Sequence, residues 1–494
     1  MRYFSAAALA GLASLLFAYG VARPMAPALA THPCVEGKSR TPAICGTFRV
    51  YENPAAHAGR TIELGFILLK AEHPGGRVIY FNPGGPGGLT TIYAGVFADG
   101  QAFRPIWVLR SRYDILLLDN RGMGLSHSLD CNSIYDARDP APDFLQLWPA
   151  AALRACRARD AKTSDLSDYT TDNAVDDLND LRAALGYRKI VLVGGSYGTY
   201  FSLVYIRRHP RSVESAVLDG VAPPHLLILP LEDAYGAQLA MNDVISECAH
   251  DSVCHAHFPD LAAHFAALVR RFDRGPLTIA IRNSSTHELQ RVRLSLEVFA
   301  DRLRQMLYDE GSAAYVPIII EDAYRGNYVP LGGMVEAVTL SFPPILDTGA
   351  NLSYACAEQL PFITQAMVVR TSANSFQGDT RVRAEQEACR IWNVRPVPAS
   401  ENAIVRTTLP ILMISGTNDP TSPAIYAQEE LRYLPDARLI VQRGEGHGAT
   451  TPCTDNLIVQ FVLDGSAKNL PTSACAGSFH RPPFVTKFSL SQIE

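Results

Sequence analysis

The sequence has no excess of basic charge. Its 494 residues include 44 lysines and arginines against 49 aspartates and glutamates, which gives a formal net charge of −5 at pH 7. A nucleic-acid-binding surface requires a basic patch or stripe, and none is visible, so we expect no nucleic-acid partner. Internal repeats and low-complexity tracts are also absent. What is left is an ordinary globular composition, with 47% hydrophobic and 19% charged residues.

Long apolar runs are missing after residue 30, where no segment reaches the roughly eighteen apolar residues of a membrane-spanning helix. We therefore expect a soluble mature chain without stable membrane insertion. The N-terminus differs: Arg2 precedes the run FSAAALAGLASLLFAYGVA, and small residues end at Ala28-Leu29-Ala30, as in an export signal with its cleavage site. An uncleaved anchor is the alternative, but the run is rich in alanine and glycine. Residues 1–30 are predicted to be a cleaved signal peptide, and the protein to be periplasmic or extracellular.

Ten cysteines agree with export, because an even number of cysteines in an oxidising compartment usually forms disulfides. The cysteines fall into neighbouring couples along the chain. The predicted bridges are Cys34–Cys45, Cys131–Cys156, Cys248–Cys254, Cys356–Cys389 and Cys453–Cys475.

One couple has a second interpretation as a metal site. The segment CAHDSVCHAH places Cys248 and Cys254 beside His250, His255 and His257. Its spacing matches no standard zinc pattern, and oxidised cysteines are not thiolate ligands. We expect a disulfide there and no metal.

The order of apolar runs predicts an α/β architecture. Short continuous runs at 78–81, 114–119, 190–193 and 216–219 alternate with helix-like segments, as in a parallel sheet that is covered on both faces. Similar runs return only at 409–415 and 437–442. The segments between them have mainly helical spacing. A chain of this length also exceeds a single hydrophobic core. We predict one α/β sheet domain from residues 31–224 and 406–494, split by a mostly helical insertion at 225–405, which we call the lid.

A candidate nucleophile follows the third run. The stretch VLVGGSYGTY places Ser196 between glycines, with an apolar strand before it and a predicted helix after it. This is the context of a nucleophile elbow, in which a tight turn exposes the serine hydroxyl above the sheet. The glycines avoid a clash between the incoming strand and the outgoing helix.

A serine nucleophile needs a base, and the base needs an orienting acid. In this architecture the order along the chain is serine, acid, histidine. The segment ILMISGTNDPTSP ends a strand and delivers Asp419, and the loop RGEGHGAT presents His447 between two glycines. Glu445 and Asp436 are alternative acids, but neither closes a strand. Ser196, Asp419 and His447 are the predicted catalytic triad.

Acyl transfer also needs donors for the oxyanion. The segment IYFNPGGPGGLTT is a strand followed by a glycine-rich loop, and we assign the two N–H donors to Gly85 and Tyr197. A phosphate-binding loop is the alternative for GGPGG. It would require a Lys-Ser/Thr ending or a G-x-G-x-x-G helix start, and neither fits well.

Together these motifs resemble the α/β-hydrolase fold, and specifically its proline iminopeptidase and tripeptidyl aminopeptidase group. The motifs are NPGGPGG at 82–88, LLDNRGMGLS at 117–126, GGSYGTY at 194–200, GTNDPTSP at 416–423 and GHG at 446–448. Proline iminopeptidases usually begin the oxyanion loop with histidine, whereas this chain has Asn82-Pro83, which favours the tripeptidyl aminopeptidase branch. The resemblance implies an exported serine exopeptidase that releases short peptides or single residues from free N-termini, with no metal or organic cofactor. An exported carboxylesterase or lipase with the same triad, and a non-catalytic binding module, are the alternatives.

An exopeptidase must also recognise the free α-ammonium group of its substrate. The triad motifs contain no spare acid, so we expect a lid carboxylate to bind it, and Glu358 is the candidate because the predicted Cys356 bridge would fix its position. Glu321, Asp322 and Glu232 are alternatives. A solvated surface glutamate, without a function, is the competing interpretation of Glu358.

Overall fold

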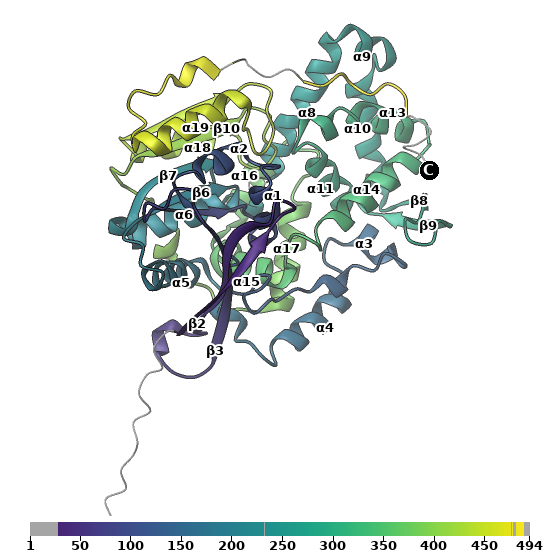
Figure 1. Ribbon diagram of the computed structural model, residues 1–494. Coiled ribbons are helices and arrows are strands. Elements are labelled where there is room, and N and C mark those ends of the chain that lie inside the picture. Colours follow the sequence, from purple (N-terminus) through teal and green to yellow (C-terminus); the bar gives the residue numbers. More distant parts are fainter. Residues whose placement is uncertain (1–27, 232, 476, 478–480, 489–494) are drawn as a thin grey trace, which may run out of the picture.

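The computed structural model describes residues 28–231, 233–475, 477 and 481–488 (Figure 1). Most of the predicted signal peptide and Glu232 lie outside this range, whereas Ala28, Leu29 and Ala30 begin the first strand. The centre of the fold is a nine-stranded sheet in the order β1-β2-β3-β5-β4-β6-β7-β10-β11. None of the helices among the described residues is long and apolar enough to span a bilayer.

The sheet has an antiparallel part and a parallel part. Strands β1, β2, β3 and β5 pair antiparallel in that order, and all pairs from β5 through β4 and β6 to β11 are parallel. The strands are β1 Ala28–Glu36, β2 Thr41–Tyr51, β3 Thr61–Leu69, β4 Val78–Asn82, β5 Asp114–Leu118, β6 Ile190–Gly195, β7 Val213–Asp219, β10 Ile411–Gly416 and β11 Ala437–Gln442. All six predicted strands are confirmed, and the sheet is mostly parallel as expected.

Each face of the sheet carries its own hydrophobic core, because successive side chains of a strand point to opposite faces. In β5, Leu116 and Leu118 belong to one core, and Ile115 and Leu117 belong to the other. The first core is completed by α5 (Thr171–Ala184) and α6 (Tyr197–Arg208), and the second by α1 (Ala94–Ala98), α2 (Arg104–Leu109) and α19 (Pro452–Asp464). The remaining helices of the sheet domain are α3 Ala141–Leu145, α4 Ala150–Asp160 and α18 Ala424–Glu430.

Between β7 and β10, which are neighbours in the sheet, the chain forms a mostly helical lid with a third core (Figure 1). Its elements are α7 Ile228–Leu231, α8 Asp233–His250, α9 Ser252–His257, α10 Leu261–Arg271, β8 Leu277–Arg282, β9 Leu289–Leu294, α11 Leu296–Met306, α12 Glu310–Ala313, α13 Val316–Tyr324, α14 Val329–Ser341, α15 Thr348–Glu358, α16 Gln365–Ser372 and α17 Thr380–Trp392. Side chains of α15 and α17, including Tyr354 and Trp392, join the core of the sheet. The lid is therefore packed onto the sheet domain and is not a separate globule.

All five predicted disulfides are present. They are Cys34–Cys45, Cys131–Cys156, Cys248–Cys254, Cys356–Cys389 and Cys453–Cys475. The first joins β1 to β2, at the antiparallel edge of the sheet. The fourth joins lid helices α15 and α17, two residues before Glu358. Each bridge links segments that are close in the sequence, as the spacing predicted.

Candidate active site

Ser196 lies in the turn between β6 and α6, with backbone angles of φ 52° and ψ −126°. Residues other than glycine rarely adopt a positive φ, and this backbone conformation costs about 1–3 kcal/mol. The Ser196 N–H donates to the carbonyl of Asp219 at 2.8 Å, and its carbonyl accepts from Thr199 N–H at 2.8 Å. The turn is therefore held from both sides, and this geometry is that of the predicted elbow.

Close backbone contacts explain the glycines around Ser196. A Cβ atom on Gly194 would lie 2.2 Å from the Gly198 carbonyl oxygen, and one on Gly198 would lie 2.3 Å from the Asn82 carbonyl oxygen. Both distances are too short for any larger residue. The strand β6, the helix α6 and the loop after β4 meet here without space for side chains.

Asp419 and His447 are in direct contact. The buried Asp419 follows β10, and its Oδ2 accepts a hydrogen bond from His447 Nδ1 at 2.8 Å. Its Oδ1 accepts from the Thr421 and Ser422 N–H groups at 2.9 and 2.8 Å, and Ser422 Oγ donates to Oδ2 at 2.8 Å. The carboxylate is thus fixed by four donors. The alternative acids Glu445 and Asp436 have no hydrogen bond to His447 among the described residues.

The two groups shift each other's pKa. Burial opposes the charge of both, but their ion pair and hydrogen bond outweigh it, so the pKa of Asp419 is lowered and that of His447 is raised. The described residues include no hydrogen bond between Ser196 Oγ and His447. Catalytic hydrogen bonds are often formed only when substrate binds, so this arrangement remains compatible with proton transfer.

The loop after β4 is folded against the elbow. Asn82 Oδ1 accepts from Gly84 N–H at 3.0 Å, which is a contact that the Asn82-Pro83 sequence makes possible. A Cβ atom on Gly84 would lie 2.8 Å from Ser196 Cβ and 3.2 Å from Tyr197 N. The Gly84 N–H is therefore occupied, whereas the N–H groups of Gly85 and Tyr197 have no partner among the described residues. The two predicted oxyanion donors lie on the two segments that touch at Ser196.

A cavity of about 130 Å³ opens beside this loop, between Gly85, Pro86 and the lid. Its lid wall contains a charge cluster that no sequence motif indicated, and all of its members are buried except Arg381, which is partly exposed. We call it the lid cluster; its members are Asp233 of α8, Asp301, Arg302 and Arg304 of α11, and Arg381 and Glu385 of α17. Neither its acids nor its arginines form a motif, because the six residues are spread over three helices.

Asp301 is the centre of the lid cluster. Its carboxylate accepts from Arg302 Nη1 at 2.7 Å, Arg304 Nη2 at 3.1 Å and Arg381 Nη1 at 3.0 Å. Burial opposes its charge, but the three arginines outweigh this effect and place the pKa of Asp301 far below its usual value. Burial raises the pKa of Glu385 to about 7, against the lowering effect of Arg381. The Glu385 Oε2 atom is buried without a hydrogen bond, at 3.3 Å from Arg381 Nε.

Glu358 is buried, with 2% of its surface exposed, so the interpretation as a solvated glutamate is wrong. It lines a second cavity, of about 20 Å³, together with Pro86 and Tyr197. Both of its oxygens accept from Thr171, one from the backbone N–H and the other from Oγ1 at 2.8 Å. Burial raises the pKa of Glu358 to about 8, although the Thr171 hydrogen bonds oppose the shift.

The alternative acids Glu321 and Asp322 lie elsewhere, on α13. Glu321 accepts from His264 Nδ1 at 2.7 Å and also pairs with Arg325 at 2.6 Å. Asp322 accepts from Asn327 Nδ2 at 3.0 Å. Neither residue lines the two cavities beside the Gly85 loop.

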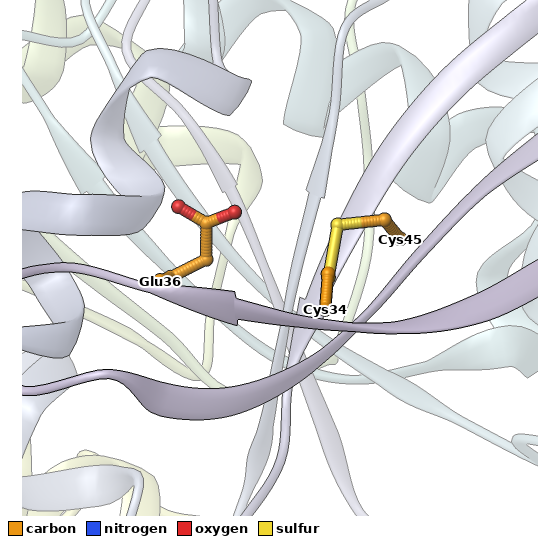
Figure 2. Close-up of side chains that lie close together, drawn as sticks. All are labelled: Cys34, Glu36 and Cys45. Atoms are coloured by element: carbon orange, nitrogen blue, oxygen red, sulfur yellow. A yellow bond between two sulfur atoms is a disulfide. The ribbon is translucent and has the colours of Figure 1, made fainter.

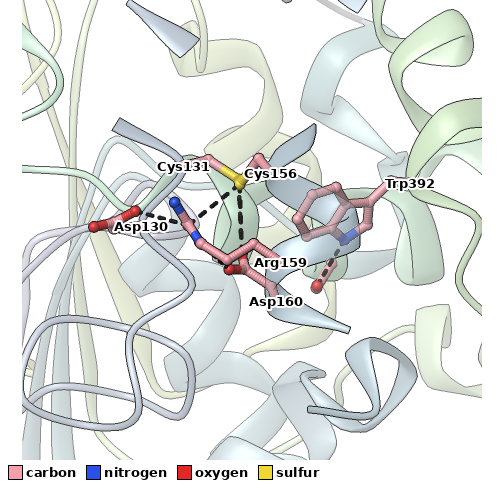
Figure 3. Close-up of a disulfide and its surroundings, with 7 residues drawn as sticks. Asp130, Cys131, Cys156, Arg159, Asp160 and Trp392 are labelled. Carbon is pink, nitrogen blue, oxygen red and sulfur yellow. Dashed lines mark hydrogen bonds and ion pairs between the residues drawn. A yellow bond between two sulfur atoms is a disulfide. The ribbon is translucent and has the colours of Figure 1, made fainter. Parts of the chain in front are cut away.

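Among the residues that the structure describes, two groups of cysteine and carboxylate side chains are compact enough to resemble metal sites. Figure 2 shows Glu36 beside the Cys34–Cys45 bridge, and Figure 3 shows Asp160 beside the Cys131–Cys156 bridge. In both groups the sulfur atoms are joined in a disulfide, so neither group offers a thiolate. The same holds for Cys248 and Cys254. His250 and His257 each bond a carbonyl of their own helix turn through Nδ1.

Comparisons with known proteins agree with this fold. A family model described as alpha/beta hydrolase fold matches residues 77–450. The tripeptidyl aminopeptidase of Streptomyces lividans is 30% identical over 465 residues, which cover 86% of this chain and 82% of that protein. Serine protease Hip1 of Mycobacterium tuberculosis is 24% identical over 472 residues, which cover 86% of each chain. A proline iminopeptidase of Neisseria gonorrhoeae is 27% identical over 163 residues, 33% of this chain and 37% of that one.

Proposed function

Because the chain belongs to the α/β-hydrolase fold family and is a serine peptidase of that fold, we propose that it is an exported tripeptidyl aminopeptidase-like exopeptidase. It would hydrolyse peptide bonds near free N-termini through Ser196, His447 and Asp419. The observation that carries the proposal is the contact of the strained Ser196 turn with the Gly84–Gly85 loop, next to the Asp419–His447 pair. The disulfides are consistent with export.

The mechanism follows from the positions of the groups. His447 accepts the proton of Ser196 Oγ as the oxygen attacks the scissile carbonyl, and the Gly85 and Tyr197 N–H groups bind the oxyanion. Asp419 orients His447 and stabilises the imidazolium ion. His447 then protonates the leaving amine. Water, activated by His447, hydrolyses the acyl-enzyme and restores the serine.

Ser196→Ala tests this mechanism, with Ser202→Ala as the matched control. Ser202 lies on the same helix, and its hydroxyl is buried and donates to the Gly198 carbonyl at 2.7 Å. We expect Ser196→Ala to lose peptidase activity by about a factor of 10⁴ or more, with an unchanged or slightly higher melting temperature because the strained turn can relax. Ser202→Ala should remain active. Substantial activity in the Ser196→Ala variant would refute the mechanism.

Substrate class is tested with matched peptides and esters. A peptidase that recognises a free α-ammonium group should cleave free tripeptide amides much faster than their N-acetylated forms, because a blocked substrate leaves a buried carboxylate unpaired at a cost of roughly 2–5 kcal/mol. Equal cleavage of both would favour an endopeptidase. Preference for short-chain esters over all peptides would favour a carboxylesterase.

We propose Glu358 as the anchor of the α-ammonium group, since it lines a cavity together with Pro86 and Tyr197. Glu385 is the matched comparison: it is also a buried lid glutamate, and it lines the larger cavity. Glu358→Gln should reduce the ratio of kcat/KM for free over acetylated peptides by tenfold or more. Glu385→Gln should leave this ratio nearly unchanged. The opposite result would assign the anchor to Glu385.

A further inference from the structure

Asp219, the last residue of β7, contacts two of the loops that build the site. Its backbone carbonyl accepts the N–H of Ser196 at 2.8 Å. Its side-chain Oδ1 accepts the N–H of Ala449, two residues after His447, at 3.1 Å. One residue therefore links the turn of the nucleophile to the loop of the histidine.

Gly220, the next residue, extends this link to the strand that precedes Asp419. Gly220 N–H donates to the carbonyl of Ile414 at 3.0 Å, on the strand β10 that leads to Asp419. Gly220 has a φ of +68°, and a Cβ atom there would lie 3.0 Å from His447 Cε1. The backbone at the end of β7 thus lies against the imidazole ring of His447, and a side chain at position 220 would not fit between the two.

The Asp219 carboxylate also acts on His447 through its charge. Asp419, whose Oδ2 accepts the hydrogen bond from His447 Nδ1, and Asp219 both raise the pKa of His447. Arg304 of α11 lowers it. Glu445 lies close enough to Asp219 for their charges to interact, and Tyr308 packs its ring 4.9 Å from the His447 ring. Asp419 occupies Nδ1, so Asp219 reaches His447 only through space and through Ala449.

We propose that Asp219 is a positioning residue for the hydrolytic reaction: it holds the His447 loop against the nucleophile turn and provides a second negative charge for the imidazolium ion. This inference rests on the proposed function. Imidazolium forms when the serine proton is transferred, and the ionised form of a nearby carboxylate stabilises it. Burial raises the pKa of Asp219 to about 7, with Asp419 adding to the shift and His447 and Ala449 N–H opposing it.

Asp219→Asn separates the two parts of this role, because asparagine keeps an oxygen that can accept from Ala449 N–H but loses the charge. We expect its kcat to fall about tenfold with KM nearly unchanged. The acid limb of its pH profile of kcat/KM should move to lower pH by about half a unit, since a lost negative charge lowers the pKa of His447. In Asp219→Ala, which also loses the hydrogen bond to Ala449 N–H, kcat should fall about a hundredfold.

Asp114→Asn is the control for a lost buried carboxylate. Asp114 begins β5, at the other end of the sheet from Ser196, and accepts from Ala71 N–H at 2.7 Å. This variant should change the melting temperature without moving the pH profile. A profile of Asp219→Asn that superimposes on that of the wild type would overturn the inference. Inactive wild-type protein, or active Ser196→Ala, would instead refute the proposed function.

If Asp219→Asn does not fold, the pH profile of Asp219→Ala tests the same inference. Its acid limb should also move to lower pH, because the negative charge is lost in this variant too. An unchanged acid limb in this variant would contradict a charge effect of Asp219.

Discussion

The sheet end that carries Ser196 and the lid wall that faces it are stabilised in different ways. At the sheet end, Ser196, Asp219 and Gly220 are fixed mainly by backbone hydrogen bonds and by contacts that only glycine allows. In the lid cluster, one fully buried aspartate, Asp301, holds three arginine side chains. The first arrangement depends on backbone geometry, and the second depends on charge.

This difference predicts how each region responds to substitution. Conservative changes of the catalytic side chains leave the backbone hydrogen bonds intact, so they should reduce activity with little effect on stability. Removal of one charge from the lid cluster leaves the opposite charges with fewer partners in a buried place, so it should reduce stability first. Arg304 connects the two regions, because its Nη1 donates to Thr421 Oγ1 at 2.7 Å, next to Asp419.

After Ser196→Ala, the largest expected effect at the sheet end is that of Asp419→Asn. Asparagine can still fill the site but favours the wrong tautomer of His447 and no longer stabilises the imidazolium ion. We expect kcat to fall by roughly a thousandfold or more, with a change in unfolding free energy below about 2 kcal/mol. Steady-state kinetics and urea unfolding measure the two quantities. Loss of folding together with activity would contradict the separation of the two regions.

The largest expected loss of stability follows from Asp301→Asn in the lid cluster. The buried Arg302 and Arg304 and the partly buried Arg381 would lose their shared carboxylate, and breaking a buried ion pair typically costs about 3–5 kcal/mol. Urea unfolding should show this loss, and the protein that remains folded should still react with a fluorophosphonate at Ser196. Since the pKa of Asp301 is lowered, its stabilisation is present at neutral pH and disappears only in strong acid. Unaltered stability would refute the assignment of the cluster as structural.

Arg304→Met tests the connection between the regions. This substitution removes the hydrogen bond from Arg304 to Thr421 and a positive charge that lowers the pKa of His447. We expect kcat/KM to fall about tenfold and the acid limb of the pH profile to move to higher pH, opposite to Asp219→Asn. Arg302→Met is the matched control, because the hydrogen bonds of the Arg302 side chain within the described part of the chain go to Asp301 and Thr339, both in the lid. A similar shift in both variants would argue against a specific role of Arg304.

The smallest effect is expected from the short disulfide at Cys248–Cys254. Its sequence separation is 6, against 33 for Cys356–Cys389, and the loop-entropy contribution grows only with the logarithm of this number. Replacing both cysteines of the short bridge should cost about 2 kcal/mol of unfolding free energy, and about 1.5 kcal/mol less than replacing those of the long one. Activity should be retained. An equal loss for both bridges would show that loop closure is not the main contribution.

Local sequence patterns predicted the sheet end well. The runs at 190–193 and 409–415 are continuous and apolar because both faces of β6 and β10 are buried, and the glycines around Ser196 mark contacts that leave no space for a Cβ atom. The edge strand β1 was not predicted, because most of its side chains are exposed; it is joined to β2 by backbone pairing and by the Cys34–Cys45 disulfide.

The lid cluster could not be predicted in the same way. Asp233, Asp301 and Arg381 each occupy an ordinary position in an amphipathic segment, and only the packing of α8, α11 and α17 brings them together. Glu358 was identified by its distance from Cys356 along the chain, but its burial and its bonds to Thr171 of α5 depend on the folded lid. Charge pairs between distant helices leave no periodic signal in a single sequence.

The most direct test of the account is the site of covalent labelling by a fluorophosphonate. The wild-type protein is treated with the reagent, digested and mapped by mass spectrometry, with Ser196→Ala treated in parallel. The account predicts a single modification, at Ser196 within the peptide that contains VGGSYGTY, and no modification of the variant. Labelling at another serine, or equal labelling of the variant, would contradict it.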